Sequence, residues 1–275
     1  MKRHLEMLLE ERPEEVPERP TENPVLYMMT RTIRSGTLTE VECYPVYRYQ
    51  YRRKLKATSP TSEAMKAVND RNARKRFERF ANCNFQVGKD YALSLTYDDN
   101  APEDPAVCNR EIRNYLARVN RARKRKKLPP ARYMGVLETG KLGRLHHHLL
   151  IEGGLDRDEM EALWGKGFAN CDRIQAGKGG LLALVRYMTK GFSNKRDKGR
   201  HRYIFSRNLK RPRVTESRTR ISRHQAELIR EDADAQGEII FRKKYPEMAM
   251  EEMTVSQSEW MPGCYIYARL RNCRR

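Results

Sequence analysis

The chain has 275 residues, of which 33% are charged and 39% hydrophobic, and its formal net charge is +20. This length suffices for one substantial domain with extensions or for two small domains. The positive charge predicts a polyanionic partner, and nucleic acid is favoured over an acidic membrane surface because no clear amphipathic helix sets Trp or Phe opposite Lys and Arg. No stretch is apolar enough for a membrane span or a signal peptide, so we expect no membrane association and a cytoplasmic location.

The six cysteines argue against two further classes of protein. None of them forms a Cys-x-x-Cys pair and no spacing repeats, which disfavours a zinc ribbon. A disulfide framework is not expected inside the cell, so we interpret them as reduced thiols.

The two ends of the chain differ in composition from its centre. Residues 1–24 are rich in Glu and Pro, which predicts a flexible acidic lead segment. Residues 25–83 form a basic N-terminal extension that is partly helical, with Ser62 as the cap of a helix running to about Phe80. Residues 214–275 are more polar and more acidic, and the sequence assigns this C-terminal extension no role.

The central segment, residues 84–213, has the patterns of a folded domain. Tyr91–Tyr97 alternates strictly, which predicts a strand, and Asp104 followed by proline opens a helix to about Arg123. Residues 133–138 and 145–151 are strand-like and flank a glycine-containing turn, as in a hairpin.

The rest of this domain continues the pattern of helices and strands. Asp156 is a plausible cap for a short helix through Trp164, a strand ends near Ile174, and residues 181–190 have helical spacing. The order strand, helix, strand, strand, helix, strand, helix predicts an α+β fold with a central antiparallel sheet and flanking helices.

Three consecutive histidines lie in the second strand of the predicted hairpin. Because side chains alternate along a strand, His146 and His148 share one face, and His147 points to the packing side. Glu138 lies on the preceding strand, where pairing could bring it beside the two histidines. Two histidines and one carboxylate leave open positions for water or substrate and suit Mn²⁺ or Mg²⁺ when phosphate oxygens complete the shell. An isolated His-x-His is weak evidence, because such pairs also occur on ordinary sheet surfaces.

Tyr187 and Lys190 are three residues apart, so they share one face of a helix. A free phenol with a pKa of ~10 is only about 0.1% ionised at neutral pH, so a nucleophilic tyrosine needs help from a cation or a base. Lys190 could supply that charge. The alternative is a tyrosine that half-packs against the sheet.

Taken together, these segments resemble the HUH endonucleases, in the order Ser94–Tyr97, Glu138 with His146–His148, and Tyr187–Lys190. The similarity is greatest to the single-tyrosine rolling-circle replication initiators of plasmids, phages and integrative elements. It covers about residues 75–213, including flanking text at Ala81–Phe85 and Ser206–Pro212. The chain departs from the family pattern at His147, where a hydrophobic residue usually stands.

The resemblance implies an RRM-like or ferredoxin-like HUH fold and a metal-dependent nickase. Glu138, His146 and His148 would be the metal ligands, Tyr187 the nucleophile and Lys190 the supporting base or charge. The substrate would be single-stranded or hairpin origin DNA, joined to Tyr187 through a 5′-phosphotyrosine. A host helicase and DNA polymerase would then extend the released 3′-OH.

Two basic segments, Arg118–Lys127 and Lys195–Arg213, fit binding to phosphates, and Tyr203 and Phe205 are candidates for base stacking. Three functions remain open. The first is rolling-circle initiation, and the second is another HUH role, as a single-tyrosine transposase or a mobilisation relaxase. The third is a non-enzymatic nucleic-acid binder in which Tyr91 and Tyr97 would stack bases.

Overall fold

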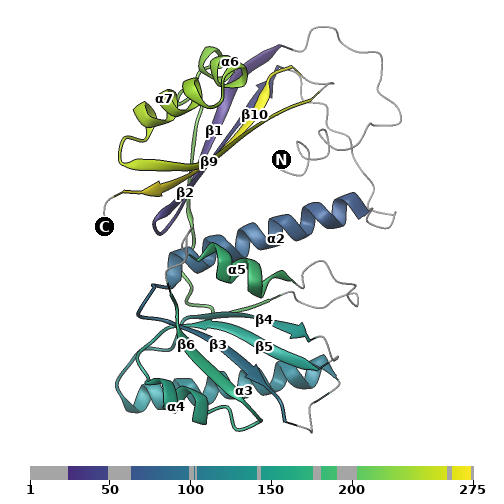
Figure 1. The fold of residues 1–275 in the computed structure, drawn as a ribbon, viewed down its shortest axis with the longest axis vertical. Coiled ribbons are helices and arrows are strands. Elements are labelled where there is room, and N and C mark those ends of the chain that lie inside the picture. The colour runs from purple at the N-terminus through teal and green to yellow at the C-terminus, as the bar shows by residue number, and fades with distance from the viewer. Residues whose placement is uncertain are drawn as a thin grey trace. The chain divides into compact units, whose positions relative to one another are not determined.

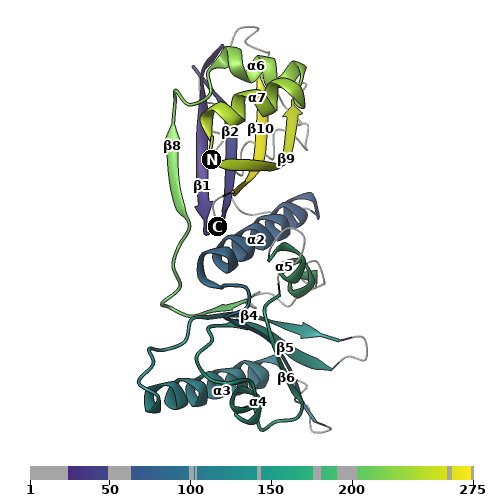
Figure 2. The same ribbon diagram turned by 60° about the vertical axis from the view of Figure 1, so that its left-hand side comes forward.

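The computed structural model describes residues 24–48, 63–98, 102, 104–140, 144–175, 181–190, 203–258 and 262–273. Almost all of the predicted acidic lead segment, the Ser62 cap and the first part of the Lys195–Arg213 segment lie outside these residues. The chain divides into two compact units, Asp70–Arg211 and a unit built from Met1–Asn69 with Pro212–Arg275. Each contains a five-stranded antiparallel sheet with helices, so the predicted α+β class is confirmed (Figures 1 and 2).

The unit formed by Asp70–Arg211 has the predicted order of elements. Its elements are β3 (Tyr91–Thr96), α3 (Pro105–Arg125), β4 (Tyr133–Thr139), β5 (Leu145–Ile151), α4 (Arg157–Ala162), β6 (Ala169–Arg173), α5 (Leu182–Met188), β7 (Ile204–Phe205) and the part of α2 (Glu63–Asn84) from Asp70 onward. The strand order is β6-β3-β5-β4-β7, and every pair is antiparallel. The first four strands and two helices therefore form the βαββαβ arrangement of ferredoxin-like domains.

Helices α3 and α4 cover one face of this sheet (Figure 1). The alternating residues of β3, from Tyr91 to Leu95, and the adjoining Tyr97 are buried on that face, as their spacing predicts. Helix α3 begins where expected, because the Asp104 carboxylate accepts a hydrogen bond of 2.8 Å from the Ala106 amide. Burial of one helix stripe against this face anchors the central strands.

Helices α2 and α5 pack on the opposite face. Its core consists of large apolar side chains: Phe77, Ala81, Phe85, Met134, Val136, Leu150, Ile174, Leu181, Val185 and Met188. Along β4 the same face continues from Val136 to Glu138, and along β5 it continues from Leu150 to His148 and His146. The face is therefore apolar at one end and polar at the other, and the polar end carries the candidate ligands.

The other unit joins segments from both ends of the chain. Its elements are β1 (Val25–Ser35), β2 (Leu38–Tyr47), β8 (Arg213–Ser217), α6 (Arg223–Glu231), α7 (Ala235–Lys244), β9 (Met248–Gln257) and β10 (Cys264–Asn272). The strand order is β8-β1-β2-β10-β9, with α6 and α7 on one face (Figure 2). The sequence treated residues 25–83 and 214–275 as separate extensions, whereas β2 pairs directly with β10, for example Cys43 with Ile266.

Two expectations from composition can be compared with these elements. Among the described residues, no helix is long and apolar enough to cross a membrane. The six cysteines are all free thiols, and Cys43, Cys108, Cys171 and Cys264 are buried. They therefore contribute to packing and form no disulfide.

Candidate metal centre and tyrosine site

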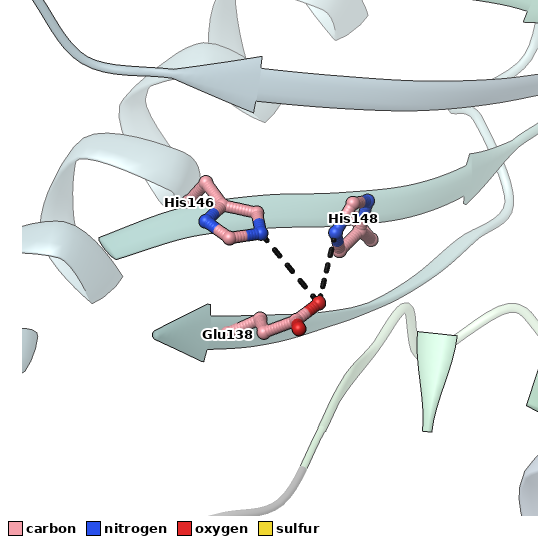
Figure 3. A group of neighbouring side chains, drawn as sticks. All are labelled: Glu138, His146 and His148. Carbon is pink, nitrogen blue, oxygen red and sulfur yellow. Dashed lines mark ion pairs between the residues drawn. The ribbon is translucent and has the colours of Figure 1, made fainter. Parts of the chain in front are cut away.

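Glu138, His146 and His148 converge on one face of the β4–β5 hairpin (Figure 3). Glu138 lies directly opposite His146 in the strand register, and His148 is the next residue along that face. The Glu138 Oε2 atom is 3.0 Å from His148 Nε2 and 3.5 Å from His146 Nε2. Three candidate ligand atoms lie within 4.8 Å of one another. The hairpin pairing thus brings together the three residues that the sequence proposed.

The chemistry of this cluster fits a divalent cation. Glu138 Oε2 and His148 Nε2 are both buried, and neither has a hydrogen-bond partner. Burial, reinforced by His146, lowers the pKa of His148 to about 4, so its ring is neutral near pH 7. A carboxylate oxygen and an imidazole lone pair that face each other without a proton are complementary to a positive ion. Neutral imidazole and carboxylate are also the forms in which these side chains bind metals.

Tyr187 and Lys190 lie beside the cluster at the end of α5. Lys190 Nζ is 3.0 Å from Glu138 Oε1 and 4.3 Å from the centre of the Tyr187 ring. The ring centres of Tyr187 and His148 are 5.3 Å apart. Tyr187 is 51% exposed, so its hydroxyl is accessible to a large substrate. The hydrogen bond to Glu138 raises the pKa of Lys190, which therefore carries a positive charge near the phenol.

Local packing explains why α5 presents these two residues. Val185 and Met188 are buried in the core on this face of the sheet, which turns the opposite side of the short helix outward. The Thr189 hydroxyl donates a hydrogen bond of 2.7 Å to the Val185 carbonyl at the end of the helix. The helical spacing predicted that Tyr187 and Lys190 share a face, and the structure adds that this face meets Glu138 and His148.

His147 has a different environment from its two neighbours. It is 1% exposed and lies on the α3 side of the sheet, where its Nε2 atom is 3.0 Å from the Tyr97 hydroxyl. The Trp164 ring lies 6.1 Å away, centre to centre. Burial lowers the pKa of His147 to about 3, so it remains a neutral packing residue. The prediction from strand alternation is confirmed.

Tyr91 and Tyr97 are not available to stack bases. They are 2% and 7% exposed, respectively, and lie in the core beneath α3. Their hydroxyls are also engaged, Tyr91 with the Leu155 carbonyl and Tyr97 with His147. A binding surface built on these two rings, as the non-enzymatic alternative requires, is therefore excluded by their burial.

The basic and aromatic segments have mixed roles. Arg123 is 2% exposed and donates to the carbonyls of Pro129 and Gly153, and Arg118 donates to those of Leu163 and Trp164. These two arginines hold loops, whereas residues 124–127 are exposed. Tyr203 and Phe205 stack on each other at 4.4 Å between ring centres and pack against Phe77.

The register also adds residues to which the sequence assigned no role. Ser94 lies opposite His148, and Thr96 lies opposite His146. The alternation of β3 had separated them from the buried tyrosines and leucines but did not identify the strand beside them. Their side chains extend the polar end of the sheet face beyond the histidines.

Residues 90–192 match a family model of replication-associated proteins, the ORF2 type. This span begins at β3 and contains the hairpin cluster together with Tyr187 and Lys190. It lies inside the region that resembles HUH endonucleases, and it supports a role in the initiation of replication. No curated protein and no solved structure matches the chain.

Proposed function

We propose that the protein initiates rolling-circle replication by nicking and rejoining single-stranded origin DNA through a 5′-phosphotyrosine intermediate. The observation that carries this proposal is the convergence of an exposed tyrosine, a lysine and a two-histidine, one-carboxylate cluster. Lys190 contacts both Glu138 and the Tyr187 ring, so the nucleophile and the candidate metal ligands form one site. The match of residues 90–192 to a replication-associated family supports the biological setting.

In the proposed reaction the Tyr187 oxygen attacks the scissile phosphorus. A bond forms between this oxygen and phosphorus, and the bond from phosphorus to the 3′-oxygen breaks. The phenolic proton passes through solvent to the departing oxygen, which leaves as a 3′-OH, while the 5′-phosphate stays on the tyrosine. Attack by a 3′-OH reverses these changes and rejoins the strand. No nucleotide is consumed, because the phosphotyrosine bond conserves the energy of the phosphodiester.

Each residue of the site has a distinct task. Lys190 places positive charge beside the phenol and thereby favours its ionised form. Glu138, His146 and His148 would hold the Mn²⁺ or Mg²⁺ ion, which supplies Lewis-acid stabilisation of the phosphate when bound. The exposure of Tyr187 allows the strand to approach, and the buried His148 and Glu138 side chains form the floor of the site.

The match to a replication-associated family favours initiation over the other HUH functions. A transposase or a mobilisation relaxase would use the same chemistry on different DNA. The surrounding DNA distinguishes them, because a nearby hairpin origin accompanies an initiator and terminal hairpins bound a transposed element.

A nicking assay with mass analysis of the product tests the chemistry. Wild-type protein with Mn²⁺ and origin-derived single-stranded DNA is expected to form a covalent adduct with the 5′-phosphate of the cleaved DNA. Tyr187→Phe is expected to form none. Tyr133→Phe is the matched control, because Tyr133 lies in the same unit on the other face of the sheet, and it should still form the adduct.

A second variant tests the ligand assignment. His148→Ala is expected to abolish cleavage while binding to the same DNA persists, since DNA contacts along the strand are retained. An adduct formed by Tyr187→Phe would disprove the nucleophile, and unchanged cleavage by His148→Ala would disprove the metal site.

A further inference from the structure

An exposed aromatic side chain stands at the β6 edge of the sheet that carries the site. Phe168 is 69% exposed, more than any other large hydrophobic residue among those described. Leaving its ring in water is unfavourable. Such exposure in a segment with a defined backbone indicates a ligand for the ring.

The backbone around Phe168 is held firmly. The Thr96 amide donates a hydrogen bond of 2.8 Å to the Phe168 carbonyl, and the Asp98 amide donates one of 3.0 Å to Lys166. Gly167 has a φ of +137°, and a Cβ added there would lie 2.5 Å from the Asp98 nitrogen. Only glycine permits this close approach, so the chain is held against β3 immediately before Phe168.

The strand register aligns Phe168 with the candidate metal centre. Leu95 pairs with Ala169, and the hydrogen bond from Thr96 extends this ladder so that Phe168 lies opposite Thr96. Thr96 in turn pairs with His146, and His146 pairs with Glu138. Residues aligned across adjacent strands point to the same face, so these four side chains form one row.

The row also gives a distance and a surface. Two strand spacings separate Phe168 from His146, which is about 10 Å between their Cα atoms. The face between them carries half-buried, uncharged polar side chains, Ser94, Thr96 and Asn170. A single aromatic ring beside hydrogen-bonding groups suits a nucleobase better than it suits an extended apolar protein surface.

We infer that Phe168 forms a base-binding subsite, on which an unpaired base of the DNA strand stacks. This inference rests on the proposed function, because it places the scissile phosphate at Tyr187 and the histidines. At roughly 3.4 Å per stacked nucleotide, the base lies within about three nucleotides of that phosphate. Stacking on a ring tolerates any base, so the subsite positions the strand and does not read its sequence.

Binding to DNA with and without bases tests the subsite. Fluorescence anisotropy would compare labelled oligothymidine with an abasic oligomer of equal length. Phe168→Ala is expected to raise the Kd for oligothymidine about 5- to 150-fold and to leave the Kd for abasic DNA unchanged. Phe168→Trp should retain wild-type affinity. Val87→Ala is the control, because Val87 is also exposed but precedes the opposite end of β3.

The outcomes separate this inference from the proposed function. An unchanged Kd of Phe168→Ala for oligothymidine, or an equal loss for abasic DNA, would overturn the base subsite. The binding assay requires no cleavage, so failure of the wild-type protein to form an adduct disproves the nickase alone. If the adduct does form, Phe168→Ala should raise the KM for cleavage and leave kcat at saturating DNA close to wild type.

Discussion

The division of labour among the three histidines predicts how the protein responds to loss of His147. This side chain is fully buried, and its one hydrogen bond among those identified joins Nε2 to the Tyr97 hydroxyl at 3.0 Å. Replacing it by Ala empties part of the core beneath α3 and leaves a buried hydroxyl without a partner. We therefore expect loss of stability, with the metal ligands retained on the other face.

The structure sets the size of this effect. An unsatisfied buried polar group costs about 1–3 kcal/mol, and large-to-small core substitutions cost roughly 2–5 kcal/mol in total. His147→Ala should therefore lower the free energy of unfolding by about 3–5 kcal/mol. His147→Phe keeps the volume and loses mainly the hydrogen bond, so about 1–3 kcal/mol is expected. Adding Tyr97→Phe to it removes the orphaned hydroxyl and should recover about 1 kcal/mol.

Guanidinium unfolding followed by tryptophan fluorescence measures these changes. The chain has two tryptophans, and Trp164 contacts both His147 and Tyr97. In a Trp260→Phe background, Trp164 alone reports on the unit that contains the site. Mn²⁺ binding would be titrated in parallel on each variant and on His148→Ala.

Two results would refute the reasoning. One is a His147→Phe protein with wild-type stability and the weak Mn²⁺ binding of His148→Ala, since that would make His147 a ligand. The other is strict additivity of His147→Phe and Tyr97→Phe, which would show that their hydrogen bond contributes nothing.

Two further substitutions test the framework around the site. Gly135→Ala places a methyl group against the Leu149 side chain and 2.7 Å from the His148 carbonyl, so it should cost about 1–3 kcal/mol in the same unfolding assay and weaken Mn²⁺ binding by displacing β5. Wild-type Mn²⁺ affinity would show that β5 tolerates this displacement. Asp104→Ala removes the cap of α3 and should cost about 1 kcal/mol, whereas Asp104→Asn should be nearly neutral. Equal losses for the two variants would assign the effect to the charge instead of the cap.

The local elements around the site were predictable because their signals are local. A strand places alternate residues on opposite faces, which separated His147 from His146 and His148. Helix caps act within one turn, so Asp104 and Asp156 marked the starts of α3 and α4. The short turn between β4 and β5 made their pairing, and therefore the approach of Glu138 to the histidines, predictable.

Pairing between distant segments was not predictable in the same way. The sheet containing β2 and β10 joins residues such as Cys43 and Ile266, and no local pattern specifies which distant strand completes a sheet. The roles of Arg118 and Arg123 were also hidden, because a basic residue that holds a buried loop has the same sequence signature as one that binds phosphate.

The sequence by itself determined which residues share a face: His146 with His148, and Tyr187 with Lys190. Periodicity of the backbone is sufficient for that. Only the tertiary structure decided that the two faces meet, because packing of Val185 and Met188 into the core orients α5 over the hairpin. It also decided that Phe168 lies in the row of Glu138 and His146, since register across four strands depends on pairings that are remote in the chain.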